Sequence, residues 1–404
     1  MSRFGTENQQ VIRQEVQNII PGNTRKSKSS VWKQFVEFCD EKLYNIHECM
    51  SVVQLATILE DYAFNMKKKN FEDYKESVVK VMWNSTAKQL QEIYYEKYKI
   101  KFNPFSDVEF ATARAARDAK RKKLQRDPLK RKVSASALTS DEYKKIIEMW
   151  DENTPNGLQR KFFHIVSHEL AWRGGEGYSA CIQYFKEETD NFGNLKGRIE
   201  YNPIFSKTTQ GGSKKLSDSK WLITNFDNPQ MCPVRLFRKL MEKRGNLIQT
   251  DRLFLTPNPY WSQPNSKGWY KNSPVGKNIV FSWFKSAASD IGIDTKKVKI
   301  TNHSARATAV SNLAKEGVNE QQLIKITGHS NSQSIKPYLQ LDVEHHHQMI
   351  ESMRRISSST SKFNNDQSSM QNKTECTQIQ TTNSSQPTNI YNNCVFNINK
   401  TYNN

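Results

Sequence analysis

The sequence predicts a multidomain protein: an all-α N-terminal domain, a mostly helical α+β domain with a small antiparallel sheet, and a disordered C-terminal tail. Residues 6–116 repeat apolar side chains at the period of an α-helix and show no alternation typical of strands. Residues 134–355 mix helical repeats with short β-branched and aromatic runs between Gly and Asn turns. From about residue 356 the chain is rich in Ser, Thr, Asn and Gln, and it has too few apolar residues to offset the entropy lost on folding.

Five amphipathic helices are predicted in the N-terminal domain. Two of them begin at a capping box, in which a Ser side chain and a Glu or Gln three residues later satisfy free N–H groups of the first turn. These boxes are Ser51-x-x-Gln54 and Ser106-x-x-Glu109. The helices are placed by apolar stripes at Val11–Ile19, Val31–Cys39, Leu55–Tyr62 and Leu90–Tyr94, and by the second box.

A run of basic residues, here called the basic strap, follows the fifth helix. Only Asp127 opposes its eight Lys and Arg side chains. One interpretation is a solvated helix end and linker. The others are a segment that tracks DNA phosphates and a nuclear localisation signal, and these can coexist. The basic strap consists of Lys120, Arg121, Lys122, Lys123, Arg126, Lys130, Arg131 and Lys132.

The second domain begins after Pro128 and a Ser-rich boundary, with a helix capped by Thr139 or Ser140. Three strands are predicted in "CIQYFK", "GRIEY" and "WLITNF". The predicted helices are 140–151, 157–171, "CPVRLFRKLMEKR", "NIVFSWFKSAA" and three short helices within 304–341, the first ending at Gly317 and the others capped by Asn319 and Ser330.

Composition limits the function. The formal net charge of +19 favours a polyanionic partner, above all nucleic acid. Six scattered cysteines with no CxxC pair argue against zinc and disulfides and fit a reducing intracellular compartment. No apolar run could span a bilayer, the first residues lack a secretory pattern, and no GxxxxGK-S/T phosphate loop occurs. We therefore expect no membrane, metal, nucleotide cofactor or small-molecule substrate.

The C-terminal part of the second domain carries four chemically active side chains: His303, Arg306, His329 and Tyr338. His303 and Arg306 are three residues apart, so they share one face of a helix. His329 follows a helix-ending glycine, and Tyr338 lies near the start of a short helix after Pro337. A histidine can accept a proton and an arginine fork suits phosphate oxygens, so with a tyrosine nucleophile they indicate metal-free phosphoryl transfer. Each residue alone could be an ordinary surface or packing residue.

Two segments that contain these residues, and a third that lies earlier in the chain, resemble a known family. "NHSARAT", "ITGHSNSQSIKPY" and "AWRGGEG" look like the signature boxes of the tyrosine recombinases, or phage-integrase-like proteins. "TNHSARATAVSNLAKEGV", "QMCPVRLFRKLMEKR" and "NFEDYKESVVKVMW" more closely resemble the Crypton-type eukaryotic recombinases and their domesticated host derivatives. The resemblance spans roughly residues 25–350.

The resemblance implies a role for each matching residue. Arg173, which opens "RGGE", matches the first phosphate-clamping arginine. His303 and Arg306 match the paired histidine and second arginine, His329 the residue that hydrogen-bonds the scissile phosphate, and Tyr338 the nucleophile. The implied reaction is a transesterification through a 3′-phosphotyrosyl intermediate.

The resemblance also implies a catalytic lysine on a β-hairpin after the first arginine, which protonates the leaving 5′ oxygen. Lys207 in "FSKTTQGG" is the preferred candidate, with Lys214 and Lys215 as competitors. The implied partner is double-stranded DNA, held by a homotetramer in a synaptic complex in the nucleus. The implied organisation is a core-binding domain at 1–119, a basic linker at 120–136, a tyrosine recombinase catalytic domain at 137–355 and a tail at 356–404.

Two other functions remain open. A domesticated descendant could bind DNA or chromatin without catalysis and keep the same fold. A type IB topoisomerase uses the same chemistry without strand exchange. Topoisomerases of this type usually have a lysine at the position of His303, so the histidine favours a recombinase. The triplet His345–His347 is interpreted as a solvated helix end in preference to a metal site, since no carboxylate cluster accompanies it.

Overall fold

The computed structural model describes most of the first 338 residues and a short segment beyond them. The chain separates into two compact units, residues 1–340 and 341–404. None of the described helices combines the length and apolarity that a bilayer span requires. The predicted disorder of the tail lies outside the described residues, which are 5–18, 20–203, 219–247, 250–329, 331–338, 347 and 350–354.

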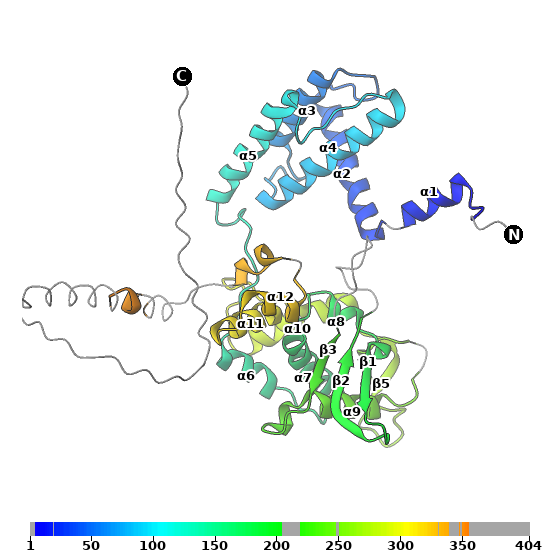
Figure 1. The fold of residues 1–404 in the computed structure, drawn as a ribbon, viewed down its shortest axis with the longest axis vertical. Helices are drawn as coiled ribbons and strands as arrows, with labels where there is room; N and C mark the ends of the chain where they lie inside the picture. The colour runs from blue at the N-terminus through cyan, green and yellow to red at the C-terminus, as the bar shows by residue number, and fades with distance from the viewer. Residues whose placement is uncertain are drawn as a thin grey trace, which may run out of the picture. The chain divides into compact units, whose positions relative to one another are not determined.

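The N-terminal domain is all helical, as predicted (Figure 1). Its core joins α2, α3, α4 and α5 around fully buried aromatic rings such as Phe35, Tyr62 and Trp83, while α1 buries no side chain. The capping box at Ser51 is confirmed, with its hydroxyl accepting from Gln54 N. The helices are α1 (Gln9–Asn18), α2 (Gly22–Glu41), α3 (Val52–Asn65), α4 (Glu76–Tyr98) and α5 (Ala111–Arg126), with a 3₁₀ turn at Val108–Phe110.

The second predicted capping box, at Ser106, is wrong. Ser106 Oγ donates to Asp107 Oδ1 over 3.2 Å, and Asp107 Oδ2 accepts from the backbone N–H of Asn103 over 2.6 Å. The side chains therefore close a turn before the helix, and no side chain caps α5. Since α5 continues to Arg126, the predicted domain boundary after residue 119 falls inside a helix, and the boundaries themselves stay a prediction.

The second domain is α+β with small antiparallel sheets, which confirms the predicted fold class (Figure 1). The predicted last helix is instead two 3₁₀ turns, Ser332–Ser334 and Lys336–Tyr338, and Asn331 caps the first of them. The other elements are α6 (Ser140–Glu148), α7 (Pro155–Glu169), α8 (Glu176–Ser179), β1 (Phe185–Thr189), β2 (Leu195–Tyr201), β3 (Lys220–Ile223), α9 (Pro233–Arg244), β4 (Leu255–Pro257), β5 (Tyr270–Pro274), α10 (Lys277–Asp290), α11 (Asn302–Lys315) and α12 (Glu320–Thr327), with 3₁₀ turns at Ile182–Tyr184 and Pro229–Met231.

Helix α7 is the centre of this domain. Eleven of its 15 residues are buried, and it packs against α6, α9 and α11. The three-stranded sheet β1–β2–β3 is antiparallel, with Tyr201 of β2 opposite both Phe185 of β1 and Lys220 of β3. Because side chains alternate along a strand, Lys220 shares the inner face of β3 with the fully buried Leu222. The sheet thus directs a lysine inward.

The core contains a histidine that ties stability to pH. His164 is fully buried, its Nδ1 lies 2.6 Å from the carbonyl oxygen of Arg160, and desolvation lowers its pKa to about 3. Between that value and about pH 6.5 the unfolded chain binds a proton that the folded chain does not, so the free energy of unfolding rises with pH. We expect this residue to lower the free energy of unfolding by about 2 kcal/mol when the pH falls from about 6.5 to about 5.

Urea unfolding at about pH 5 and pH 7 measures this loss. His164→Gln should show a smaller pH dependence than the wild type, whereas His47→Gln, at an exposed histidine, should keep it. An equal pH dependence in the wild type and His164→Gln would contradict the assignment.

Candidate active site

The C-terminal end of α7 holds two cationic side chains through its carbonyl groups. Ala171 has a left-handed φ of 46°, and Trp172 N donates to Ser167 O over 2.9 Å, so the helix ends in a Schellman motif with Ala where Gly is usual. The carbonyl of Ala171 accepts from Arg306 Nη1 over 2.6 Å, and that of Leu170 accepts from Lys220 Nζ. The partial negative charge at a helix C-terminus favours both cations.

Arg306 is the centre of the hydrogen-bond network. Its side chain is 2% exposed, and Nε donates to Nε2 of His329 over 3.2 Å. An arginine nitrogen can only donate, so Nε2 of His329 is unprotonated and Nδ1 carries the proton. Nδ1 lies 2.6 Å from Thr327 Oγ1, whose hydroxyl donates to Leu323 O. The network fixes one tautomer of His329.

The charge state of His329 follows from the same surroundings. Desolvation lowers its pKa to about 3, with the positive charges of Arg306, Arg173 and Lys220 adding to the effect. His329 is therefore neutral at physiological pH in this arrangement. Its position is fixed because it follows Gly328, whose φ of 69° ends α12.

Arg173 reaches the same group of residues from the turn after α7. Its Nη1 pairs with Glu176 Oε1 over 2.9 Å, and Nη2 donates to the carbonyl of Gly328. Glu176 Oε2 also accepts from the backbone N–H of Arg173 over 2.8 Å. One carboxylate therefore holds both the arginine and the turn that carries it. The structure brings Arg173, Arg306 and His329, which lie far apart in the sequence, into one cluster.

His303 lies in the first turn of α11, on the side of Arg173. Its side chain is exposed, and its ring lies beside Gly174, the residue after Arg173. Thr301 caps α11 by accepting from His303 N over 3.2 Å. The helix places His303 and Arg306 one turn apart, which confirms the predicted spacing.

Tyr338 ends the 3₁₀ turn Lys336–Tyr338, and only its backbone is described. The fully buried Ile335 packs with Val310 of α11 and Leu323 of α12. This small core attaches the segment that contains Tyr338 to α11, which carries Arg306, and to α12, which directly precedes His329.

The predicted catalytic lysine and its competitors, Lys207, Lys214 and Lys215, lie outside the described residues. Lys220 is a lysine at the site that sequence analysis missed. The strand was predicted to begin at Trp221. Had it begun one residue earlier, the alternation that buries Leu222 would have directed Lys220 inward as well.

The electrostatics of the cluster suit an anionic substrate. The pKa of Lys220 is lowered to about 8, chiefly by desolvation, which Glu176 opposes and the charges of Arg306 and Arg173 assist. Two arginines and a lysine around one carboxylate leave a local excess of positive charge. Such a cluster can bind a phosphate and stabilise charge that develops on it.

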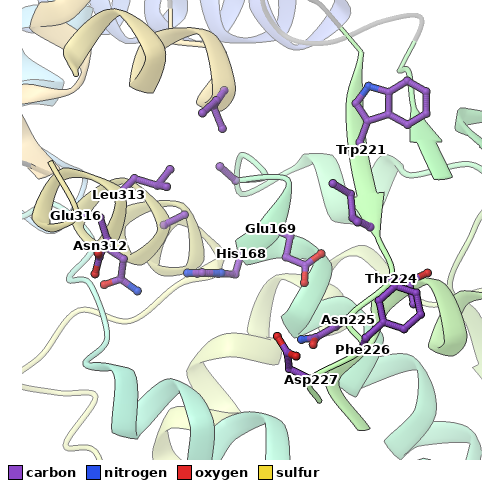
Figure 2. A pocket seen from close by; sticks show the side chains of 14 residues that line it. His168, Glu169, Trp221, Thr224, Asn225, Phe226, Asp227, Asn312, Leu313 and Glu316 are labelled. Atoms are coloured by element: carbon purple, nitrogen blue, oxygen red, sulfur yellow. The ribbon is translucent and has the colours of Figure 1, made fainter. Parts of the chain in front are cut away.

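A pocket of about 630 Å³ has Ala171, which accepts from Arg306, in its wall. Figure 2 shows apolar side chains such as Trp221, Phe226 and Leu313 around it, together with the carboxylates of Glu169 and Asp227. No lysine or arginine is among its described lining residues. The pocket does not suit a phosphate, so the arginine cluster is the better candidate site.

No group of three or more His, Cys, Asp or Glu among the described residues could hold a metal ion.

The basic strap divides into paired and exposed residues. Lys120 is 4% exposed and pairs with Asp73 over 2.8 Å, Arg121 pairs with Glu76 over 3.1 Å, and Lys130 lies 3.6 Å from Glu72. These three cations are paired with carboxylates of the N-terminal domain. The residues that remain exposed are Lys122, Lys123, Arg126, Arg131 and Lys132.

The chain is similar to known recombinases. Residues 228–345 match the model of the phage integrase family. A Tn1549 transposon integrase, in complex with a circular intermediate DNA, has a TM-score of 0.51 at 13% identity, covering 85% of this chain and 98% of that chain. XerH site-specific recombinase, bound to its palindromic difH substrate, has a TM-score of 0.50 at 12% identity, covering 78% of this chain and 76% of that chain. No curated protein sequence matches significantly. The fold is that of the tyrosine recombinases.

Proposed function

We propose that this chain is a tyrosine recombinase that cuts and rejoins duplex DNA through a 3′-phosphotyrosyl intermediate, in DNA integration or transposition. The observation that carries the proposal is the convergence of Arg173, Arg306, His329 and Lys220 at the ends of α7 and α12. The match to the phage integrase family over residues 228–345 supports it.

In the proposed reaction, the phenol oxygen of Tyr338 attacks a backbone phosphorus and displaces the 5′ oxygen of the next nucleotide. His303 takes the phenol proton, and a lysine protonates the leaving oxygen. Arg173 and Arg306 bind the non-bridging oxygens, whose charge increases in the transition state. The 5′ hydroxyl of a second strand then attacks the phosphotyrosine and restores the phosphodiester. Because the bond energy is conserved, no nucleotide is consumed.

A suicide substrate tests the proposal. The full-length protein is incubated with a nicked duplex that contains the DNA flanking its own gene, and covalent adducts are separated on a denaturing gel. Adduct formation is the expected result. Duplex binding without any adduct would instead support the domesticated, non-catalytic alternative.

A change of the leaving group in the DNA substrate can identify the lysine that acts as the acid. We propose Lys220, because its ammonium lies beside both arginines and a pKa of about 8 suits a proton donor near neutral pH. Lys220→Ala should slow cleavage about 10²–10³-fold on ordinary DNA. A substrate with sulfur in place of the leaving 5′ oxygen needs no proton and should restore the rate. If this substrate restored the cleavage rate of Lys207→Ala but not that of Lys220→Ala, the acid would be Lys207.

We also propose DNA contacts, an oligomeric state, an evolutionary origin and a cellular location for this protein. The exposed residues of the basic strap are proposed to contact phosphates, and four protomers are proposed to form the synaptic complex. The sequence resemblance supports an origin in Crypton-type elements and a nuclear location. Phosphate contacts position a protein on DNA without choosing the sequence, so the target site depends on other contacts.

A further inference from the structure

Two adjacent glycines follow Arg173, and they differ in the space around them. A Cβ atom on Gly174 would lie 2.9 Å from both Cδ2 and Nε2 of His303, closer than such atoms approach one another. A Cβ atom on Gly175 would meet only Cζ of Phe281, at an ordinary 3.9 Å. The ring of His303 therefore occupies the volume that a side chain at position 174 would fill.

Backbone conformation does not explain the glycine at 174. Neither Gly174 nor Gly175 has a positive φ, so an alanine could adopt the backbone at both positions. The difference between the two sites lies in the contact with His303.

The backbone of α11 is held firmly against this turn. Asn302 is 5% exposed, and its Nδ2 donates to Val280 O over 3.0 Å and to Gly174 O over 3.5 Å. The Thr301 cap fixes the same turn of the helix. A group added at position 174 therefore cannot push the helix away easily, and rotation of the His303 side chain is the simplest response.

We propose that Gly174 is a positioning residue for His303, because its missing side chain lets the imidazole lie beside Arg173. The proposal rests on the proposed function, in which His303 moves the proton of Tyr338. The ring lies at the surface, so it can turn toward solvent while the buried Asn302 keeps the helix in place. A side chain at position 174 thus lowers activity without unfolding the protein.

The test compares Gly174→Ala with Gly175→Ala in the full-length chain. We expect Gly174→Ala to form adducts about 10–100-fold more slowly in a single turnover, since a displacement of about 1 Å can cost this much. Gly175→Ala should stay within about twofold of the wild type. Both should unfold at the wild-type urea midpoint. A Gly174→Ala protein that cleaves at the wild-type rate would overturn the proposal.

A double-mutant cycle separates positioning from a general structural defect. In a His303→Ala background there is no ring to displace, so Gly174→Ala should cause no further loss of cleavage. An equal loss in both backgrounds would show that the glycine acts through another group. If Gly174→Ala alone fails to fold, His303→Ala should restore folding under this proposal, and failure to do so would overturn it.

Histidine NMR gives a result that does not depend on catalysis. With ¹⁵N-labelled histidine, the signals of His303 are assigned by their loss in His303→Ala. They should shift in Gly174→Ala and remain in place in Gly175→Ala, and unshifted signals in Gly174→Ala would overturn the proposal. If the wild type forms no adduct, the proposed function fails, while these spectra still decide the role of Gly174.

Discussion

Tyr338→Phe is expected to reduce covalent protein–DNA adducts at least about 10⁴-fold while leaving duplex affinity within about threefold. The substitution removes only the phenol oxygen, which is the attacking atom in the proposed reaction. Ile335 anchors the segment and does not depend on that oxygen, so the fold should not change. Adducts are counted on the suicide substrate, and affinity is measured on an intact duplex.

Tyr260→Phe is the matched control. Tyr260 is 61% exposed between β4 and β5, and it undergoes the same loss of one hydroxyl. It should form adducts at the wild-type rate. If Tyr260→Phe abolished adducts and Tyr338→Phe did not, the nucleophile would be assigned to the wrong tyrosine.

Arg306→Lys is expected to lower the rate of cleavage about 10²–10³-fold with little change in duplex affinity. Lysine keeps the positive charge, but it cannot donate at once to Ala171 O, to His329 Nε2 and to a phosphate with the planar geometry of arginine. Nε2 of His329 would lose the hydrogen bond that it accepts from Arg306 Nε. Single-turnover cleavage and duplex binding are measured on the same preparation.

Arg244→Lys controls for the burial of the arginine. Arg244 is 5% exposed and donates to the carbonyls of Thr250 and Arg252, so its bonds support only the local fold. This variant should unfold at a lower urea concentration and cleave at the wild-type rate per folded molecule. If both variants slowed cleavage equally, the effect of Arg306→Lys would reflect folding and not phosphate binding.

The long helices were predictable because they have periodic or capping signals, whereas the short α8 and the last 3₁₀ turns were not predicted correctly. The capping boxes at Ser51 and Thr139 are local patterns, and the structure has both. The strands β4 and β5 were missed, since they are short, end in proline and show no alternation.

The candidate site was predictable only in part. His303 and Arg306 share a helix face by spacing alone, and the resemblance placed Arg173 and His329 with them. The three cations of the cluster, Lys220, Arg306 and Arg173, donate to the carbonyls of Leu170, Ala171 and Gly328 respectively. A carbonyl is common to every residue type, so no letter of the sequence marks it as a partner.

The anchoring of the cations by main-chain oxygens bears on how such a protein could lose its activity over generations. Replacement of Leu170 or Ala171 would keep the acceptor oxygens, so the side chains at these two positions are constrained by burial and by the left-handed φ of Ala171 and not by the binding of cations. Within the cationic cluster, loss of the positive charge therefore requires substitution of the arginines or the lysine themselves. We expect a relative that no longer cuts DNA to have substitutions at Arg173, Lys220 or Arg306, or at the proposed nucleophile Tyr338.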